Sequence, residues 1–314
     1  MRVRPSTFSI AARDPETDAV GVAVQSKFIG VGAVVPFVSA DAGAVATQSF
    51  ANVAYGPDGL DLLREGHDAS AVVEQLTEAD DDAPSRQVGI VGTDGTTAAF
   101  TGEECHDHAG DRQGENYTVH GNILENAETL DAMAETFETG DGGFPERLIA
   151  ALHAGNEAGG DKRGEQSAAL YVAKPEGGYD GRNDRWIDVR VDDHERPIDE
   201  LERVFKLYDV TLLERESPEE TRELTGQTAA GVRDALADLG FYDGGPNEPP
   251  EEDESFGEAD RDALETFRGM NNFENHPVPV LEDALARGWD EADGEGESRL
   301  VDAVWHGLSR LDRV

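Results

Sequence analysis

Residues 8–25 read FSIAARDPETDAVGVAVQ, which is two apolar runs on either side of a short polar turn. Apolar and small side chains alternate through 8–12 and again through 20–25, the pattern of two β-strands. Asp14, Pro15 and Asp18, between the two runs, are residues that favour turns. The chain therefore opens with a predicted β-hairpin.

Three further pairs of strands are predicted along the first two thirds of the chain. They are 33–37 with 43–48, 88–91 with 97–101, and 168–173 with 186–191. The first of these pairs is sparse in charge, which predicts strands that are covered on both faces. Helical spacing of apolar residues predicts helices at 59–64, 69–78, 127–137, 145–153 and 198–213. This order favours helix layers that cover two stacked, mainly antiparallel sheets.

A second unit is predicted after residue 213, since a length of 314 residues is typical of two domains. We place the first domain at 1–213, a charged linker at 214–226 and the second domain at 227–314. Helical spacing recurs at 228–239, whereas 243–262 is so polar that we expect a solvated loop. The predicted core of this unit is small: Leu264, Phe267, Leu281, Leu285, Leu300, Val304, Trp305 and Leu308.

The net charge of -41 comes from 67 acidic and 26 basic residues. Such a charge repels polyanions, so we expect neither a nucleic-acid partner nor an anionic membrane. Concentrated salt would screen the self-repulsion, because the Debye length falls to about 3 Å at 1 M. We therefore expect a salt-adapted protein, and the alternative is an acidic protein from an ordinary cytoplasm.

A cytoplasmic location is expected from three features of the sequence. Cys105 is the single cysteine, so no internal disulfide is possible. No apolar run approaches the ~18 residues that a membrane span needs. The first six residues lack the apolar core of a signal peptide.

Several short motifs occur in a fixed order over residues 7–208, and together they resemble the domain-of-unknown-function family numbered 1028. The resemblance implies an α/β (α+β) fold, the four-layer αββα sandwich of the N-terminal nucleophile hydrolase superfamily, but no established reaction. The motifs are TFSI at 7–10, GVAVQSKF at 21–28, ATQ at 46–48, YGP at 55–57, GNIL at 121–124 and GDKRGEQSAAL at 160–170.

The region 225–308 is similar to a peptidoglycan-binding domain that often follows that family. The similar stretches are VRDAL at 232–236, LGFY at 239–242 and FRGMNNFE at 267–274, and the acidic insertion departs from the pattern. Because no export signal is evident, we interpret this region as a helical accessory domain without assigning a cell-wall ligand.

The resemblance places the nucleophile at Thr7. In that superfamily the hydroxyl of an N-terminal residue attacks, and its α-amine, with a pKa near ~7.7–8, is the base. The amine of Thr7 becomes free only when the Ser6–Thr7 bond is cleaved, for example by attack of the Thr7 hydroxyl on the preceding carbonyl. The alternative is a threonine that starts a strand because of its β propensity.

Three further catalytic residues are implied by the same resemblance. Lys27 ends the second strand, where its charge would lower the pKa of the amine and stabilise developing negative charge. Asp161 and Ser167 match in placement the residues that orient the amine in related threonine hydrolases. The alternatives are a solvated edge lysine and a structural, salt-bridged turn.

Substrate contacts are predicted at Gln48, Asn122, Lys162 and Arg163. Gln48, or the backbone amides beside it, could donate to an oxyanion, although a strand end bonded to its neighbours is an equal explanation. His120 stands where we expect a glutamine in the family, which leaves a polar role there open.

A metal site is not predicted. Cys105, His106 and His108 offer soft and imidazole ligands, yet their spacing matches no standard metal-binding pattern. We therefore expect neither a metal nor a cofactor.

The leading hypothesis is an amidohydrolase that acts on a small amide or peptide-like substrate. The alternative is a module that keeps the fold without the chemistry and serves in small-molecule binding or assembly, because family analogy is a weak guide to reaction type. In either case we expect a small-molecule ligand and self-association into a homo-oligomer.

Overall fold

The computed structural model describes residues 7–105, 108–213, 220–242, 256–288 and 294–308. The chain forms two compact units, 1–204 and 205–314. The division falls inside helix α5 (Pro197–Leu212), ahead of the linker expected at 214–226. The reason is that Val210, near the end of α5, is buried in the core of the second unit.

The first unit contains a six-stranded antiparallel sheet in the order β10-β9-β2-β1-β8-β7. The predicted hairpin is confirmed, because β1 pairs with β2 from Thr7 opposite Ser26 to Arg13 opposite Val20. On its other edge β1 pairs with β8, which sets Thr7 opposite Asn122. The strands are β1 (Thr7–Arg13), β2 (Val20–Ser26), β7 (Gly110–Gly114), β8 (Tyr117–Asn122), β9 (Ser167–Ala173) and β10 (Arg185–Val191).

A four-stranded antiparallel sheet has the order β3-β4-β5-β6. Its strands are β3 (Pro36–Ser39), β4 (Gly43–Ser49), β5 (Arg86–Gly92) and β6 (Thr97–Thr101). The strand predicted at 33–37 is wrong in its first half, because a 3-10 helix (Val31–Ala33) follows the left-handed Gly30, with φ of 66°, and the strand begins only at Pro36.

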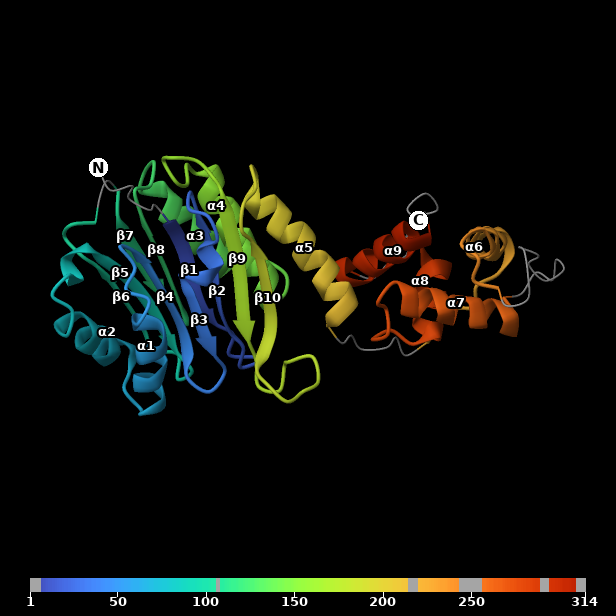
Figure 1. The fold of residues 1–314 in the computed structure, drawn as a ribbon, viewed down its shortest axis with the longest axis horizontal. Helices are drawn as coiled ribbons and strands as arrows, with labels where there is room; N and C mark the ends of the chain where they lie inside the picture. The colour runs from blue at the N-terminus through green and yellow to red at the C-terminus, as the bar shows by residue number, and fades with distance from the viewer. Residues whose placement is uncertain (1–6, 106–107, 214–219, 243–255, 289–293, 309–314) are drawn as a thin grey trace. The chain divides into compact units, whose positions relative to one another are not determined.

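Two pairs of helices cover the outer faces of the sheets (Figure 1). Helices α1 (Tyr55–Arg64) and α2 (Ala69–Glu78) contact the four-stranded sheet, whereas α3 (Glu128–Thr139) and α4 (Phe144–Glu157) contact the six-stranded one. A short 3-10 helix (Ala83–Ser85) precedes β5. The two sheets contact each other through their inner faces. The predicted four-layer αββα sandwich is therefore confirmed.

The space between the sheets is filled by small branched and apolar side chains from alternate strand positions. Each valine among them contributes roughly 1.5–3 kcal/mol when fully buried. Toward the start of β1 the filling changes to polar side chains that are also buried, among them Ser9, Gln48 and Gln87. The apolar part comprises Ala11, Val20, Val22, Val24, Val31, Val35, Val38, Ala44, Ala46, Val91, Ala169 and Ala173.

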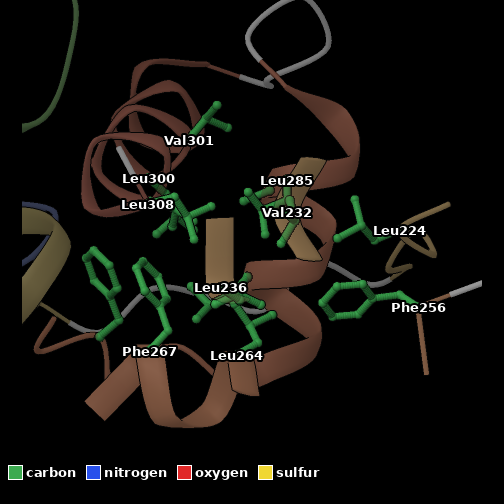
Figure 2. Close-up of a cluster of buried hydrophobic side chains, with 14 of the residues drawn as sticks. Leu224, Val232, Leu236, Phe256, Leu264, Phe267, Leu285, Leu300, Val301 and Leu308 are labelled. Carbon is green, nitrogen blue, oxygen red and sulfur yellow. The ribbon is translucent and has the colours of Figure 1, made fainter. Parts of the chain in front are cut away.

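The second unit is helical, with α6 (Gly226–Asp238), α7 (Glu258–Met270), α8 (Val278–Arg287) and α9 (Gly294–Leu308) around the apolar cluster in Figure 2. Seven of the residues predicted for this core are buried and Trp305 is partly buried. The loop predicted at 243–262 is wrong from Glu258 onward, where α7 begins; residues 243–255 lie outside the described residues. Asp260 is buried there because it accepts hydrogen bonds from Arg233 and from the Gly257 amide.

Candidate functional site

A pocket of about 300 Å³ lies at the start of β1, beside Thr7. Its walls come from the segment that follows β2, from the end of β4 and from the start of β5. Most of the lining side chains are apolar. The lining residues are Thr7, Phe28, Val31, Val34, Val35, Gln48, Ser49, Phe50, Ala51 and Arg86.

Thr7 is held at the pocket wall by β2 of its own sheet and by β4 of the other sheet. Its side chain points into the space between the sheets and is almost fully buried, with an exposed fraction of 2%. The Thr7 hydroxyl lies 3.1 Å from the Ser26 hydroxyl on β2. The Thr7 carbonyl accepts a hydrogen bond of 3.4 Å from the Gln48 side-chain amide on β4. Thr7 is thus held from the two sheets at once, through its hydroxyl from β2 and through its backbone carbonyl from β4.

A buried network of uncharged polar side chains lies behind Thr7. Ser9 donates to Gln48 Oε1 at 2.6 Å, which turns the Gln48 Nε2 group toward Thr7 and toward Gln87 Oε1, 2.8 Å away. Gln87 Oε1 also accepts from Asn122 Nδ2 at 3.0 Å, and Gln87 Nε2 donates to the Gly121 carbonyl at 2.8 Å. The network therefore joins β1, β4, β5 and β8.

His120 completes this network as a neutral imidazole. Its Nε2 atom lies 3.0 Å from the Ser9 hydroxyl oxygen. Because Ser9 gives its hydrogen to Gln48, we assign the proton of the imidazole to Nε2. Burial lowers the pKa of His120 to about 4, and it outweighs the opposing influence of Asp111. The sequence left the role of His120 open, and the fold places it in the network behind Thr7.

Arg86 brings a positive charge to the pocket wall, and that charge is already paired. Its Nε donates to Asp80 at 2.9 Å, and its Nη1 donates to the Phe50 carbonyl. Asp80 also accepts hydrogen bonds from Asn52 and Tyr55, each 3.0 Å long. The Arg86 guanidinium holds the pKa of the Asp80 carboxyl well below its ordinary value. The pair therefore adds little net charge to the pocket.

Lys27 follows the end of β2, Asp161 lies in the loop that precedes β9, and neither residue lines the pocket. The Lys27 ammonium donates to the Glu165 carbonyl at 2.8 Å, and its side chain is exposed. The buried Asp161 carboxylate accepts from the Lys27 amide at 2.8 Å and from the Arg163 guanidinium at 3.0 and 3.2 Å. These bonds clamp the loop that precedes β9.

Ser167 fixes the segment that forms one wall of the pocket. Its hydroxyl donates to the Phe28 carbonyl and accepts from the Val31 amide at 3.2 Å. Ser167 pairs with Ser26 on β2, which in turn pairs with Thr7. Ser167 thus contacts a pocket wall and lies two strands from Thr7.

The structure brings three of the eight predicted site residues together: Thr7, Gln48 and Asn122. Lys27, Asp161, Arg163 and Ser167 gather instead around the loop before β9, and Lys162 is exposed there, with its amide donating to the Ile123 carbonyl at 3.2 Å. Sequence reasoning missed Gln87 and Arg86. Both stand just before the strand predicted at 88–91. Polar residues are common at strand ends, so their presence there did not indicate a functional role.

Cys105 lies close to the pocket but outside its lining. Its thiol contacts the Ser49 hydroxyl at 3.5 Å and the Arg86 carbonyl at 3.3 Å, and burial raises its pKa. His106, considered above as a ligand, lies outside the described residues, as does Ser6. Within the part of the chain that the structure describes, no three His, Cys, Asp or Glu residues are grouped in a way that could hold a metal ion.

Residues 7–201, well over half of the chain, match the model of a family described as "Family of unknown function (DUF1028)". The chain belongs to this family. The crystal structure of a family member from Silicibacter pomeroyi is similar to it, with 34% sequence identity and a TM-score of 0.60. The match covers 65% of this chain and 89% of that one.

The second unit has a match of its own. Residues 211–305 match a family model described as "Putative peptidoglycan binding domain". No curated protein matches the sequence. Among the helices of the described residues, none is long and apolar enough to cross a membrane.

Proposed function

We propose that this member of family 1028 is an amidohydrolase that cleaves a small amide or peptide-like substrate with Thr7 as its nucleophile. The observation that carries the proposal is the position of Thr7. It starts a central strand, lines a pocket of about 300 Å³ and is held from both sheets.

The proposed reaction begins once the Ser6–Thr7 bond has been hydrolysed and the α-amine of Thr7 is free. That amine accepts the hydroxyl proton while Thr7 Oγ1 attacks the carbonyl carbon of the substrate amide. The C–N bond then breaks, the leaving amine takes the proton, and an ester with Thr7 forms. Water, deprotonated by the same amine, hydrolyses the ester, releases a carboxylic acid and restores Thr7.

The neutral network has a positioning role in this proposal. Gln48 contacts the Thr7 carbonyl, and Ser9 fixes the orientation of the Gln48 amide. Preorganised groups of this kind reduce the reorganisation that a reaction needs. The reaction as written uses groups of the chain itself and water.

A second candidate function, a binding module without catalysis, is favoured by a specific set of contacts. Lys27 donates to the Glu165 carbonyl, and Asp161 is engaged by Arg163 and by two backbone amides. These bonds are those of a structural turn rather than of groups directed at Thr7. In this alternative the same pocket binds a small molecule and releases it unchanged.

Two substitutions of Thr7 separate the candidates. Thr7→Val has nearly the same shape but lacks the hydroxyl, whereas Thr7→Ser retains it. We expect amine release from a panel of small acyl amides by the natural protein and by Thr7→Ser, and none by Thr7→Val. Ligand binding without turnover in all three proteins would favour the binding module. Circular dichroism provides the control for folding.

We also propose that the protein works in concentrated salt in the cytoplasm and self-associates there. The net charge of -41 supports the first part, because added salt screens like charges on a folded surface. The expected result is a melting temperature that rises between 0.1 and 2 M salt. A melting temperature that falls over that range would contradict it.

A further inference from the structure

We infer that the Thr7 pocket selects an uncharged, apolar group, aliphatic or aromatic, attached to the carbonyl of its ligand. This inference rests on the proposed function for its position beside the scissile amide. The evidence for the apolar preference is the composition of the walls, the pairing of their charge and the surface around the opening.

Two separate segments of the chain supply the apolar part of the pocket walls. Val31, Val34 and Val35 come from the segment between β2 and β3, and Phe50 and Ala51 follow β4. A ligand group that enters the pocket and contacts these side chains removes their apolar surface, and its own, from water. Each buried methylene then strengthens binding about fourfold, which corresponds to ~0.8 kcal/mol.

The polar groups of the lining are already engaged. Gln48 is bonded at both ends of its amide, to Ser9 and to Gln87. Arg86, the one charged side chain among the described residues that line the pocket, is paired with Asp80. A ligand carboxylate would therefore lose its hydration without meeting an unpaired cationic side chain among these residues, which is unfavourable.

The charge of the whole chain acts in the same direction. A protein of net charge -41 repels an anionic ligand over the range that the salt concentration allows. The pocket thus disfavours carboxylates by local chemistry at all salt concentrations and by long-range repulsion at low salt.

The surface beside the pocket is also apolar, in a chain whose surface is otherwise rich in acids. Phe28, which lines the pocket, is 39% exposed, and Ile29 next to it is 61% exposed. Val53, two residues after Ala51, is 45% exposed. Among the described residues only four other large apolar side chains are this exposed: Tyr179, Leu207, Leu212 and Met270. The apolar lining therefore continues onto the surface, where it can meet an apolar ligand.

The test measures binding without chemistry, in the full-length Thr7→Val protein at high salt. The probes are linear methyl ketones from butanone to 2-octanone, which carry a carbonyl but no amide to hydrolyse. The matched anionic probe is 7-oxooctanoate, a methyl ketone whose chain ends in a carboxylate. Dissociation constants are measured by titration followed with NMR.

The expected result is affinity that rises about fourfold per added methylene until the pocket is filled, and at least tenfold weaker binding of 7-oxooctanoate. Val34→Asp, which puts a carboxylate on the pocket wall, should weaken the binding of 2-octanone at least tenfold. Ala33→Asp is the matched control, because Ala33 is exposed and does not line the pocket.

Two results would overturn the inference: no chain-length dependence of binding, or binding of 7-oxooctanoate as tight as that of 2-octanone. If Ala33→Asp weakened ketone binding as much as Val34→Asp does, the assignment of the binding site to the Thr7 pocket would be overturned. Ketone binding as expected, together with no hydrolysis of any amide by the natural protein, would support the inference and count against the proposed function alone.

Discussion

The interior between the sheets of the first unit and the helical unit bury polar side chains in different ways. Between the sheets of the first unit the buried network behind Thr7 is neutral, with Ser9, Gln48, Gln87 and His120 joined by hydrogen bonds. In the helical unit the buried polar side chains include charged pairs such as Arg233 with Asp260. A neutral network fixes the positions of its side chains and responds little to salt. A buried ion pair supports stability only while both partners are present, because removal of one leaves the other charge buried and uncompensated.

The largest effect is expected from breaking the charged pair. Arg233→Met leaves the Asp260 carboxylate, with an exposed fraction of 1%, without its partner at 3.0 Å. We expect the free energy of unfolding of the helical unit to fall by roughly 3–5 kcal/mol, measured by urea denaturation. The double variant Arg233→Met, Asp260→Leu should regain most of that loss. A single variant within about 1 kcal/mol of the natural protein would show that the pair is solvated.

The neutral network should respond to pH through His120. Its pKa of about 4 in the folded protein lies below the ordinary 6.5, so between these values the unfolded chain binds more protons than the folded one. Stability conferred by the neutral imidazole is therefore intact above pH 6.5 and falls as the pH drops to 4, by about 3 kcal/mol in all.

The test compares the natural protein with His120→Gln, which keeps a donor for Ser9 but does not titrate. The difference in unfolding free energy between the two should change by about 3 kcal/mol from pH 7 to pH 4. His67→Gln, at an exposed position, serves as the control and should show almost no change. A constant difference for His120→Gln would contradict the neutral assignment.

A smaller loss is expected from Gln87→Leu. The substitution removes the buried acceptor that Gln48 and Asn122 share, and the loss of these two hydrogen bonds costs roughly 2 kcal/mol of unfolding free energy. If the network positions Thr7, hydrolysis should fall mainly in kcat. Gln113→Leu, on the edge strand β7, is the control and should change stability by less than about 0.5 kcal/mol.

The smallest effect is expected from Lys27→Met. The Lys27 side chain is exposed and bonds to the Glu165 carbonyl, so its removal should change stability by less than about 0.5 kcal/mol. Because the Lys27 ammonium is bonded to the Glu165 carbonyl and not directed at Thr7, the pH profile of hydrolysis should also stay unchanged. A profile that shifts to higher pH in Lys27→Met but not in Lys27→Arg would restore Lys27 as an electrostatic partner of the Thr7 amine.

Much of the sandwich could be predicted from the sequence because its central strands alternate with period two and end at turn residues. The strands β7 and β8 were missed for a physical reason. β7 is a polar edge strand, and β8 presents His120 and Asn122 to the interior, so neither shows apolar alternation. The start of α7 was missed because the sequence around Asp260 is rich in acidic residues, which is typical of a solvated loop. In the structure Asp260 is instead buried in an ion pair with Arg233.

The residues of the candidate site could be predicted only where they lie on strands that the sequence or the resemblance identifies. Thr7 and Gln48 follow from the resemblance, and the register of β1 brings Asn122 opposite Thr7. The partners of Gln87 come from segments far apart in the sequence, and no local pattern specifies them. Arg86 pairs with Asp80, which is close in the sequence, but its place on the pocket wall depends on the fold. The pairing of Asp161 with Arg163 likewise depends on how the loop before β9 turns.

The most direct test of the Thr7 proposal is the intact mass and N-terminal sequence of protein purified at high salt. We expect a chain that starts at Thr7 in the natural protein and in Thr7→Ser, and an uncleaved chain in Thr7→Val. A natural protein that hydrolyses amides while it still carries residues 1–6 would contradict the proposed base. A natural protein that keeps those residues and hydrolyses nothing would leave the pocket as a binding site.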